Sequence, residues 1–252
     1  MLNPQLVGIV INSLRAAGIT PPELAPIRPF PKIRADTAEL PELIVSSEYE
    51  DPYADPKVIA VVSKLYIQSI GQLDQTHYLN ELRRQAAELE SHTKTILEQL
   101  QNAFNATANA LVADADPIKG VEDPATIDQR TARRDTATSA LNVTQGITTL
   151  ENLIKAWRDL WGAIGSNSYG NNAGMPFTFM NPNAQQWEEL RHKPTIWEAV
   201  RAGEPLTLAD SPEHVGKRYQ SMLHNEQVAL HALRESKHPS LLPEGGYGSF
   251  IV

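Results

Sequence analysis

Two glutamate–histidine pairs with the same spacing are the residues of this sequence best suited to chemistry. Glu189 and His192 form one Glu-x-x-His pair, and Glu235 and His238 form the other. On a helix such pairs share a face, and two of them with two further glutamates hold the ions of carboxylate-bridged di-metal enzymes. Each histidine, however, stands within two residues of a proline, where its helix must end. We therefore prefer a chance pairing and keep a di-metal carboxylate helical-bundle enzyme as the alternative.

The other reactive side chains give no catalytic pattern. His224, His231 and His238 are seven residues apart, about two helical turns, so they cannot share one metal ion. No G-x-S-x-G, H-E-x-x-H, G-x-x-x-x-G-K-[ST] or G-x-G-x-x-G motif occurs. The absence of cysteine excludes disulfides, thiolate zinc sites and thiol nucleophiles. We expect no catalytic residues and no cofactor.

Composition and charge limit the classes of molecule that this protein is expected to bind. The 252 residues carry a formal charge of −8, from 30 acidic and 22 basic side chains, with no basic block. Binding to nucleic acid or to an anionic membrane is therefore disfavoured. No run of about 18 apolar residues is present, so no membrane span is expected. The first residues have no basic leader or cleavage site, which predicts synthesis in the cytoplasm without a signal peptide.

Residues 1–55 are expected to form a short helix and an extended arm. Asn3-Pro4 starts a helix that ends near Ala17, before Gly18. Prolines follow at 21, 22, 26, 29, 31 and 41, which removes backbone donors and favours extended geometry. Four apolar side chains are spaced along this Pro-rich N-terminal arm: Leu24, Ile27, Phe30 and Ile33.

Residues 56–165 are expected to form a long antiparallel helical hairpin. Asp55-Pro56 is a helix start, and from Lys57 to Asp116 there is no proline and one glycine, Gly71, so one helix is predicted over 56–113. Asp123-Pro124 is a helix start of the same kind and predicts a second helix that ends near Gly165. Apolar residues recur at alternating spacings of three and four, which is typical of a coiled coil. The first seam is Leu79, Leu82, Ala86, Leu89, Thr93, Ile96, Leu100, Ala103 and Thr107; the second is Ala140, Val143, Ile147, Leu150, Ile154, Trp157, Trp161 and Ile164.

The length of the two helices predicts a register. A turn near residue 119 would place Leu111 opposite Ile127 and Leu97 opposite Leu141. Residues 57–73 then extend beyond the second helix, and their apolar side chains face more than one side. We expect the C-terminal third or a partner to cover this overhang.

Residues 166–252 are expected to be a loop-rich, smaller helical region with an apolar tail. Asn183 and Thr195 predict short helices over 184–191 and 196–202, and Ser211-Pro212 predicts a longer helix to about Ser236. Little β signal is present, so the fold class is mainly α.

These features favour a non-enzymatic structural component of a large particle, most consistent with a phage virion tail, neck or baseplate protein. Its partners would be copies of itself or other structural proteins, and its location the virion. A helical pore-forming toxin is a further alternative. The expected contact residues lie in the arm, the overhang and the tail: Phe30, Ile33, Val61, Leu65, Ile70, Phe250, Ile251 and Val252.

Overall fold

The computed structural model describes residues 2–30, 38–69, 73–165 and 175–237, and within these ranges the chain is mainly helical without a strand. The mainly α class predicted from the sequence is confirmed. The chain divides into two compact units. One contains residues 1–7 and 22–92, and the other contains residues 8–21 and 93–252.

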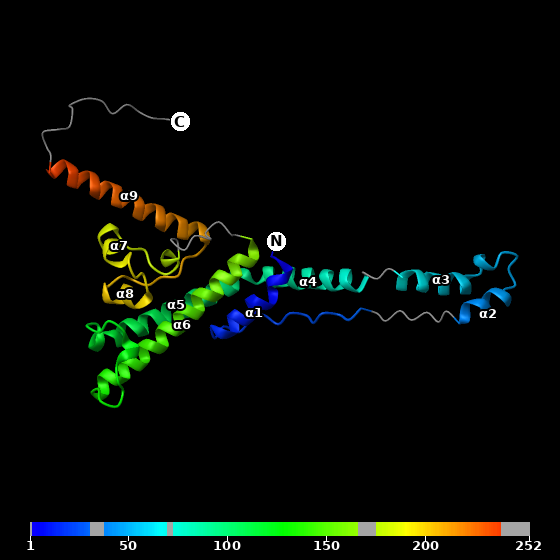
Figure 1. Ribbon diagram of the computed structural model, residues 1–252, viewed down its shortest axis with the longest axis horizontal. Helices are drawn as coiled ribbons and strands as arrows, with labels where there is room; N and C mark the ends of the chain where they lie inside the picture. Colours follow the sequence, from blue (N-terminus) through cyan, green and yellow to red (C-terminus); the bar gives the residue numbers. More distant parts are fainter. Residues whose placement is uncertain (1, 31–37, 70–72, 166–174, 238–252) are drawn as a thin grey trace, which may run out of the picture. The chain divides into compact units, whose positions relative to one another are not determined.

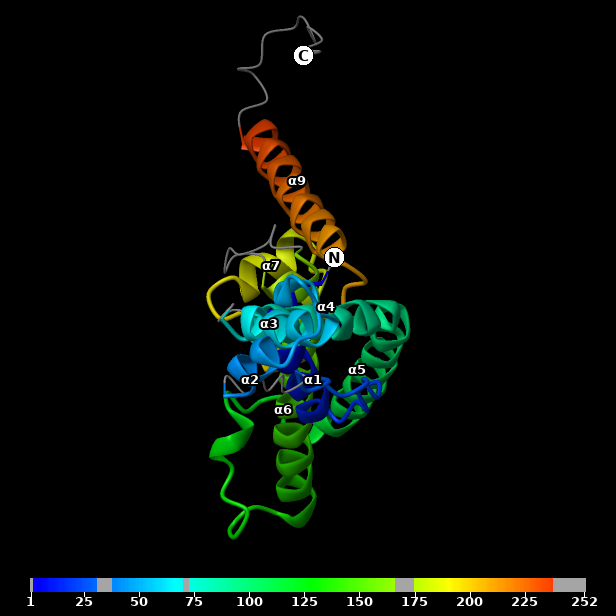
Figure 2. The same cartoon turned by 90° about the vertical axis from the view of Figure 1, so that its right-hand side faces the viewer.

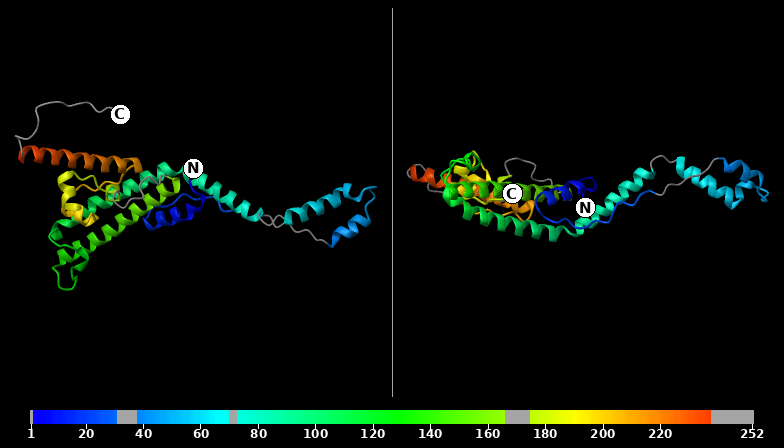
Figure 3. Two further views of the ribbon diagram at one scale, coloured as in Figure 1. Left: turned by 45° about the horizontal axis from the view of Figure 1, so that its top comes forward. Right: turned by 90° about the horizontal axis from the view of Figure 1, so that it is seen from below.

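The first unit is built from three α-helices and two 3-10 turns. They are η1 (Pro4–Leu6), α2 (Glu39–Val45), η2 (Pro52–Ala54), α3 (Pro56–Ser69) and α4 (Leu73–Ser91). Both α2 and η2 contact α3, and α2 lies beside it in Figures 1 and 3. Val58 and Val61 of α3 are buried. Part of the predicted overhang is therefore covered within its own unit.

The helix α2 corrects the prediction of an extended arm through residue 41. Pro41 lies in the first turn of this helix. Backbone N–H groups of a first turn have no intrahelical acceptor, so a proline costs no hydrogen bond there. Glu39 and Glu42 lie in the same turn, where acidic side chains interact favourably with the helix dipole. Residues 20–30 contain no helix, and 31–37 lie outside the described residues.

The second unit contains the other helices. They are α1 (Val7–Ala16, whose first residue belongs to the first unit), α5 (Thr93–Ala115), η3 (Asp116–Ile118), η4 (Pro124–Thr126), α6 (Arg134–Ile164), η6 (Pro176–Thr178), α7 (Ala184–Leu190), α8 (Ile196–Arg201) and α9 (Pro212–Lys237). Helix α6 runs alongside α5, and α7 lies beside α9 (Figures 1 and 2).

The apolar stripe of α5 advances mainly in steps of four. Its buried residues are Ile96, Leu100, Phe104, Ala108, Leu111 and Ala115. The predicted heptad seam agrees at Ile96 and Leu100, but Ala103 and Thr107 are only half-buried. Steps of four form the ridges by which helices of globular proteins commonly interlock.

The register between α5 and α6 differs from the predicted one. Leu111 lies against Gly146, where an added Cβ would come within 3.1 Å of Leu111 Cδ1. Ile127 is therefore not its neighbour on α6, which begins seven residues later. Leu141, expected to face Leu97, is 43% exposed.

Two predicted helices have different bounds in the structure. The single helix over 56–113 is wrong, because α4 ends at Ser91 and α5 begins at Thr93. There the Ser91 hydroxyl donates to Glu88 O at 2.6 Å, a bond that competes with helix continuation. The second helix begins at Arg134 rather than Pro124. Asp123 caps only the turn η4, because the polar residues that follow offer no apolar face to bury.

Most local helix signals are confirmed. Asp55 Oδ1 accepts from Lys57 N at 2.8 Å at the start of α3, and Thr195 caps α8. Asn183 and Gln186 form a reciprocal capping box at α7. Gly165 ends α6 with a φ of 86°, a conformation that disfavours a side chain.

The observed packing predicts that two leucines of α6 contribute differently to the free energy of unfolding. Leu150 is fully buried, so Leu150→Ala should lower the free energy of unfolding by about 2–5 kcal/mol, through lost burial and a cavity. Leu141→Ala is the matched control and should change it by less than about 0.5 kcal/mol. Urea unfolding followed by circular dichroism measures both, and equal losses would contradict this register.

Candidate interaction surface

Exposed apolar and aromatic side chains gather on α2, α3 and the turn between them. Six of the fourteen large ones that are exposed among the described residues lie between residues 45 and 66. We call them the α2–α3 surface: Val45, Tyr49, Tyr53, Ile59, Val62 and Tyr66. The exposed fraction is 87% for Val45 and 67% for Tyr66. Such clustering on a small helical pair is typical of a binding surface, whereas single exposed apolar residues are ordinary.

Local chemistry explains why these side chains face outward. Successive residues of a helix point about 100° apart, so burial of Val58 and Val61 leaves Ile59 and Val62 on the open side. The preceding turn is held by its own polar groups. Ser47 Oγ donates to Asp55 Oδ2 at 3.0 Å, and Asp51 Oδ1 accepts from Tyr53 N at 2.9 Å. The turn is thus shaped without using its tyrosine rings.

Acidic side chains outnumber basic ones around the α2–α3 surface: residues 39–66 include six acidic side chains and two basic ones, Lys57 and Lys64. Residues 46–55 include four acidic side chains and no basic one. Asp51 and Asp55 cap η2 and α3, whereas Glu48 and Glu50 are exposed beside Tyr49. The surface therefore combines aromatic rings with carboxylates that the fold itself does not need.

The extended residues 25–30 lie along α4. Arg84 Nη2 donates to Pro26 O at 2.8 Å, and Gln85 Nε2 donates to Ala25 O at 2.9 Å. The ring of Phe30 packs edge-on against His77, with centroids 5.5 Å apart. Backbone groups of this proline-rich stretch are thus satisfied by side chains of a helix rather than by a sheet.

Glu81 is the centre of that contact. Its side chain, 4% exposed, accepts hydrogen bonds from Arg28 Nη2 at 2.6 Å, Arg28 Nε at 3.0 Å and Arg84 Nη2 at 2.9 Å. Hydrogen bonds from the Arg28 side chain lower the pKa of Glu81 from 4.5 to about 2, helped by Arg28 N and Arg84, while burial opposes this shift. These hydrogen bonds therefore favour the ionised form of Glu81.

The predicted contact residues differ in burial, and several of them lie outside the described residues. Phe30 and Leu65 are half-buried, and Val61 is 8% exposed. The remaining ones lie outside the described residues: Ile33, Ile70, Phe250, Ile251 and Val252. Sequence reasoning missed the tyrosines of the acidic turn, although Tyr49 and Tyr53 between charged residues were a signal of exposed aromatic rings.

Glu189 and His192, the first Glu-x-x-His pair, are exposed. His238 of the second pair lies outside the described residues and the side chain of Glu235 is not among those described, so the di-metal site stays an untested alternative. No group of three or more histidine, aspartate or glutamate side chains suited to a metal ion occurs among the described residues.

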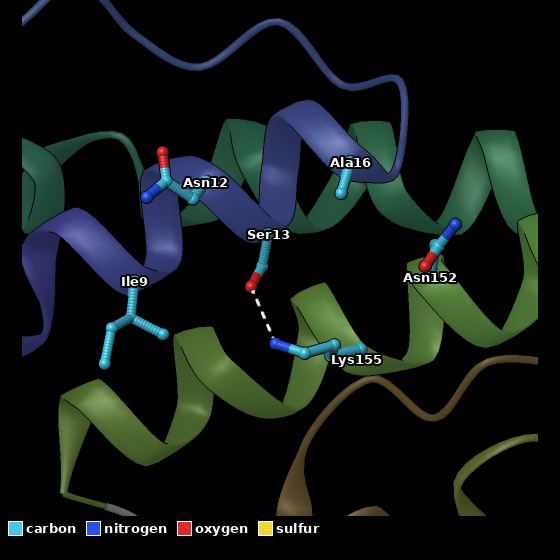
Figure 4. A pocket seen from close by; sticks show the side chains of 6 residues that line it. All are labelled: Ile9, Asn12, Ser13, Ala16, Asn152 and Lys155. Atoms are coloured by element: carbon cyan, nitrogen blue, oxygen red, sulfur yellow. Dashed lines mark hydrogen bonds between the residues drawn. The ribbon is translucent and has the colours of Figure 1, made fainter.

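A shallow pocket of about 290 Å³ lies between α1 and α6 (Figure 4). It is lined by Ile9, Asn12, Ser13, Ala16, Asn152 and Lys155. Lys155 Nζ donates to Ser13 Oγ at 3.1 Å, as Figure 4 shows, and to Asp159 Oδ2 at 2.6 Å, and the Ser13 hydroxyl donates to Asp159. A Ser–Lys nucleophile needs a lysine that accepts a proton. Here Lys155 is a donor in an ion pair and Ser13 is buried, so the group joins two helices.

Arg218 also connects elements of the fold through hydrogen bonds, here in the C-terminal part of the chain. This buried side chain donates to Thr207 O at 2.8 Å and to Phe177 O at 3.2 Å. Phe177 packs between the rings of Trp187 and Tyr219, at centroid distances of 4.9 Å and 5.3 Å. An arginine bonded to several carbonyls satisfies backbone acceptors that the fold buries.

Comparisons with protein-family models, with curated proteins and with solved structures find no match to this chain. Across the described residues no helix has the length and apolar character needed to cross a membrane.

The low pKa of Glu81 predicts an acid-sensitive first unit. A carboxylate whose pKa is lower in the folded state stabilises that state above pH 4.5, and its contribution disappears as the pH falls toward 2. Glu81→Gln should therefore lose less stability than the wild type between pH 6 and pH 3. Urea midpoints at both values test this, with the exposed Glu151→Gln as control. Equal pH dependence in wild type and Glu81→Gln would contradict the assignment.

Proposed function

We propose that this protein is a non-enzymatic structural component of a multi-subunit particle and that it binds neighbouring subunits through its α2–α3 surface. The observation that carries the proposal is the concentration of exposed Val45, Tyr49, Tyr53 and Tyr66 on one helical pair. Tyrosine is enriched at protein interfaces because it supplies a large contact area and a hydroxyl with little conformational entropy to lose.

The internal chemistry supports a mechanical role. The polar clusters at Ser13, Glu81 and Arg218 each join elements of the chain, so their reactive groups are already engaged. We further propose that α5 and α6 act as a long helical hairpin that sets a distance, and that the proline-rich stretch is an arm that aligns the contact surface.

A phage virion is the particle we propose, with the tail, neck or baseplate as the location. The supporting features are an acidic chain without cysteine and a proline-rich stretch between helical regions. The partners would be further copies of this chain or other structural proteins of the particle.

Substitutions on the α2–α3 surface should release the protein from its particle. The triple variant Tyr49→Ser, Tyr53→Ser, Tyr66→Ser should lose most co-sedimentation with purified particles, because it removes aromatic contact area. Its circular dichroism should match the wild type, since these side chains are exposed. Sedimentation through a sucrose gradient, with immunoblotting of the particle fraction, measures the loss.

The control for this experiment is Tyr78→Ser with Val112→Ser, which removes exposed side chains outside the surface. It should co-sediment like the wild type. Failure of the wild-type protein to co-sediment with any particle would reject the proposed function itself.

The C-terminal contact residues Phe250, Ile251 and Val252 stay a prediction. Removal of residues 248–252 should abolish incorporation into the particle while leaving the helical circular dichroism signal unchanged. Normal incorporation of the truncated protein would remove the tail from the proposed contact.

A further inference from the structure

The link before α6 carries three exposed guanidinium groups. Arg130, Arg133 and Arg134 are all exposed, and we call them the arginine turn. None of the three guanidinium groups takes part in an ion pair found among the described residues. Asp128 accepts from Arg130 N at 2.9 Å and so shapes the turn, and Asp135 is the acidic side chain in the first turn of α6. Three guanidinium groups therefore lie beside two carboxylates.

The position of these arginines is unfavourable for the isolated helix. Arg133 is the N-cap residue of α6 and makes no side-chain cap hydrogen bond, and Arg134 is the first helical residue. The N-terminus of a helix carries partial positive charge, so cations are disfavoured there and carboxylates are favoured. An external carboxylate would relieve this repulsion.

The α2–α3 surface offers the complementary groups. Glu48 and Glu50 are exposed on either side of Tyr49, and Tyr53 follows in the same turn. Arginine forms forked hydrogen bonds to carboxylates and stacks on tyrosine rings. The two surfaces therefore match in both charge and chemistry.

We propose that the arginine turn of one copy docks onto the α2–α3 surface of a second copy of this chain. This inference rests on the proposed assembly role and names its partner. Each copy therefore carries both halves of the contact. Two reciprocal contacts of this kind close a two-fold dimer, and a head-to-tail series of them generates a ring or a filament.

A pair of charge-reversed variants tests the contact. Variant one carries Glu48→Arg and Glu50→Arg, and variant two carries Arg130→Glu and Arg133→Glu. Each variant alone then presents two surfaces of like charge, and its self-association should weaken about tenfold or more relative to the wild type. An equimolar mixture places opposite charges together at both junctions and should restore association.

Sedimentation velocity over a concentration series measures these states at low salt, where charge pairs are screened least. The matched control, Glu23→Arg with Glu151→Arg, reverses two exposed acids outside both surfaces and should associate like the wild type.

Three results would overturn the self-contact. They are a wild-type protein that stays monomeric at every soluble concentration, variants that associate unchanged, and a mixture that associates no better than its components. Co-sedimentation of the wild type with particles tests the assembly role separately. A protein that joins particles but shows any of these three results keeps the proposed function and loses the proposed partner.

Discussion

The close approach of Leu111 to Gly146 is the constraint on which the second unit depends. A glycine in mid-helix costs about 1 kcal/mol relative to alanine, but here it lets a leucine of α5 lie on the backbone of α6. That contact sets which residues of the two helices meet, and hence why Leu150 is buried and Leu141 exposed. The C-terminal region is also tied to α5 and to the link between α5 and α6. Trp197 Nε1 donates to Val121 O at 3.0 Å, and Gln101 Nε2 donates to Asp210 Oδ1 at 2.7 Å.

The first unit depends on polar contacts to a greater degree. Its buried apolar side chains lie on different helices, Val58 and Val61 on α3 and Ala86 and Leu89 on α4, while the extended residues 25–28 are held by side chains of α4. Ion pairs and side-chain hydrogen bonds need correct geometry but bury little apolar area. Helix α3 buries one face toward α2 and η2, and the exposed apolar side chains of its other face belong to the α2–α3 surface.

Several polar side chains of the chain connect elements of its fold. Ser13, Lys155, Glu81 and Arg218 have their polar atoms engaged in this way. Among the described residues, tyrosine, glutamate and arginine side chains are exposed at the turn between α2 and α3 and at the link before α6. Tyrosine and arginine are enriched at protein interfaces, so these are the places where we propose contacts.

The sequence by itself determined where several helices and turns begin. Asn3, Asp55, Asn183 and Thr195 each cap a helix or turn through a backbone group two or three residues away, so the signal and its effect lie together in the chain. Only the tertiary structure decided the register of α5 on α6 and which face of α3 stays open. These depend on apolar contacts between residues that are distant in sequence, where several alternatives bury similar area and local patterns do not choose among them. For the same reason the heptad pattern predicted burial at Thr107, whereas packing placed Phe104 and Ala108 inside.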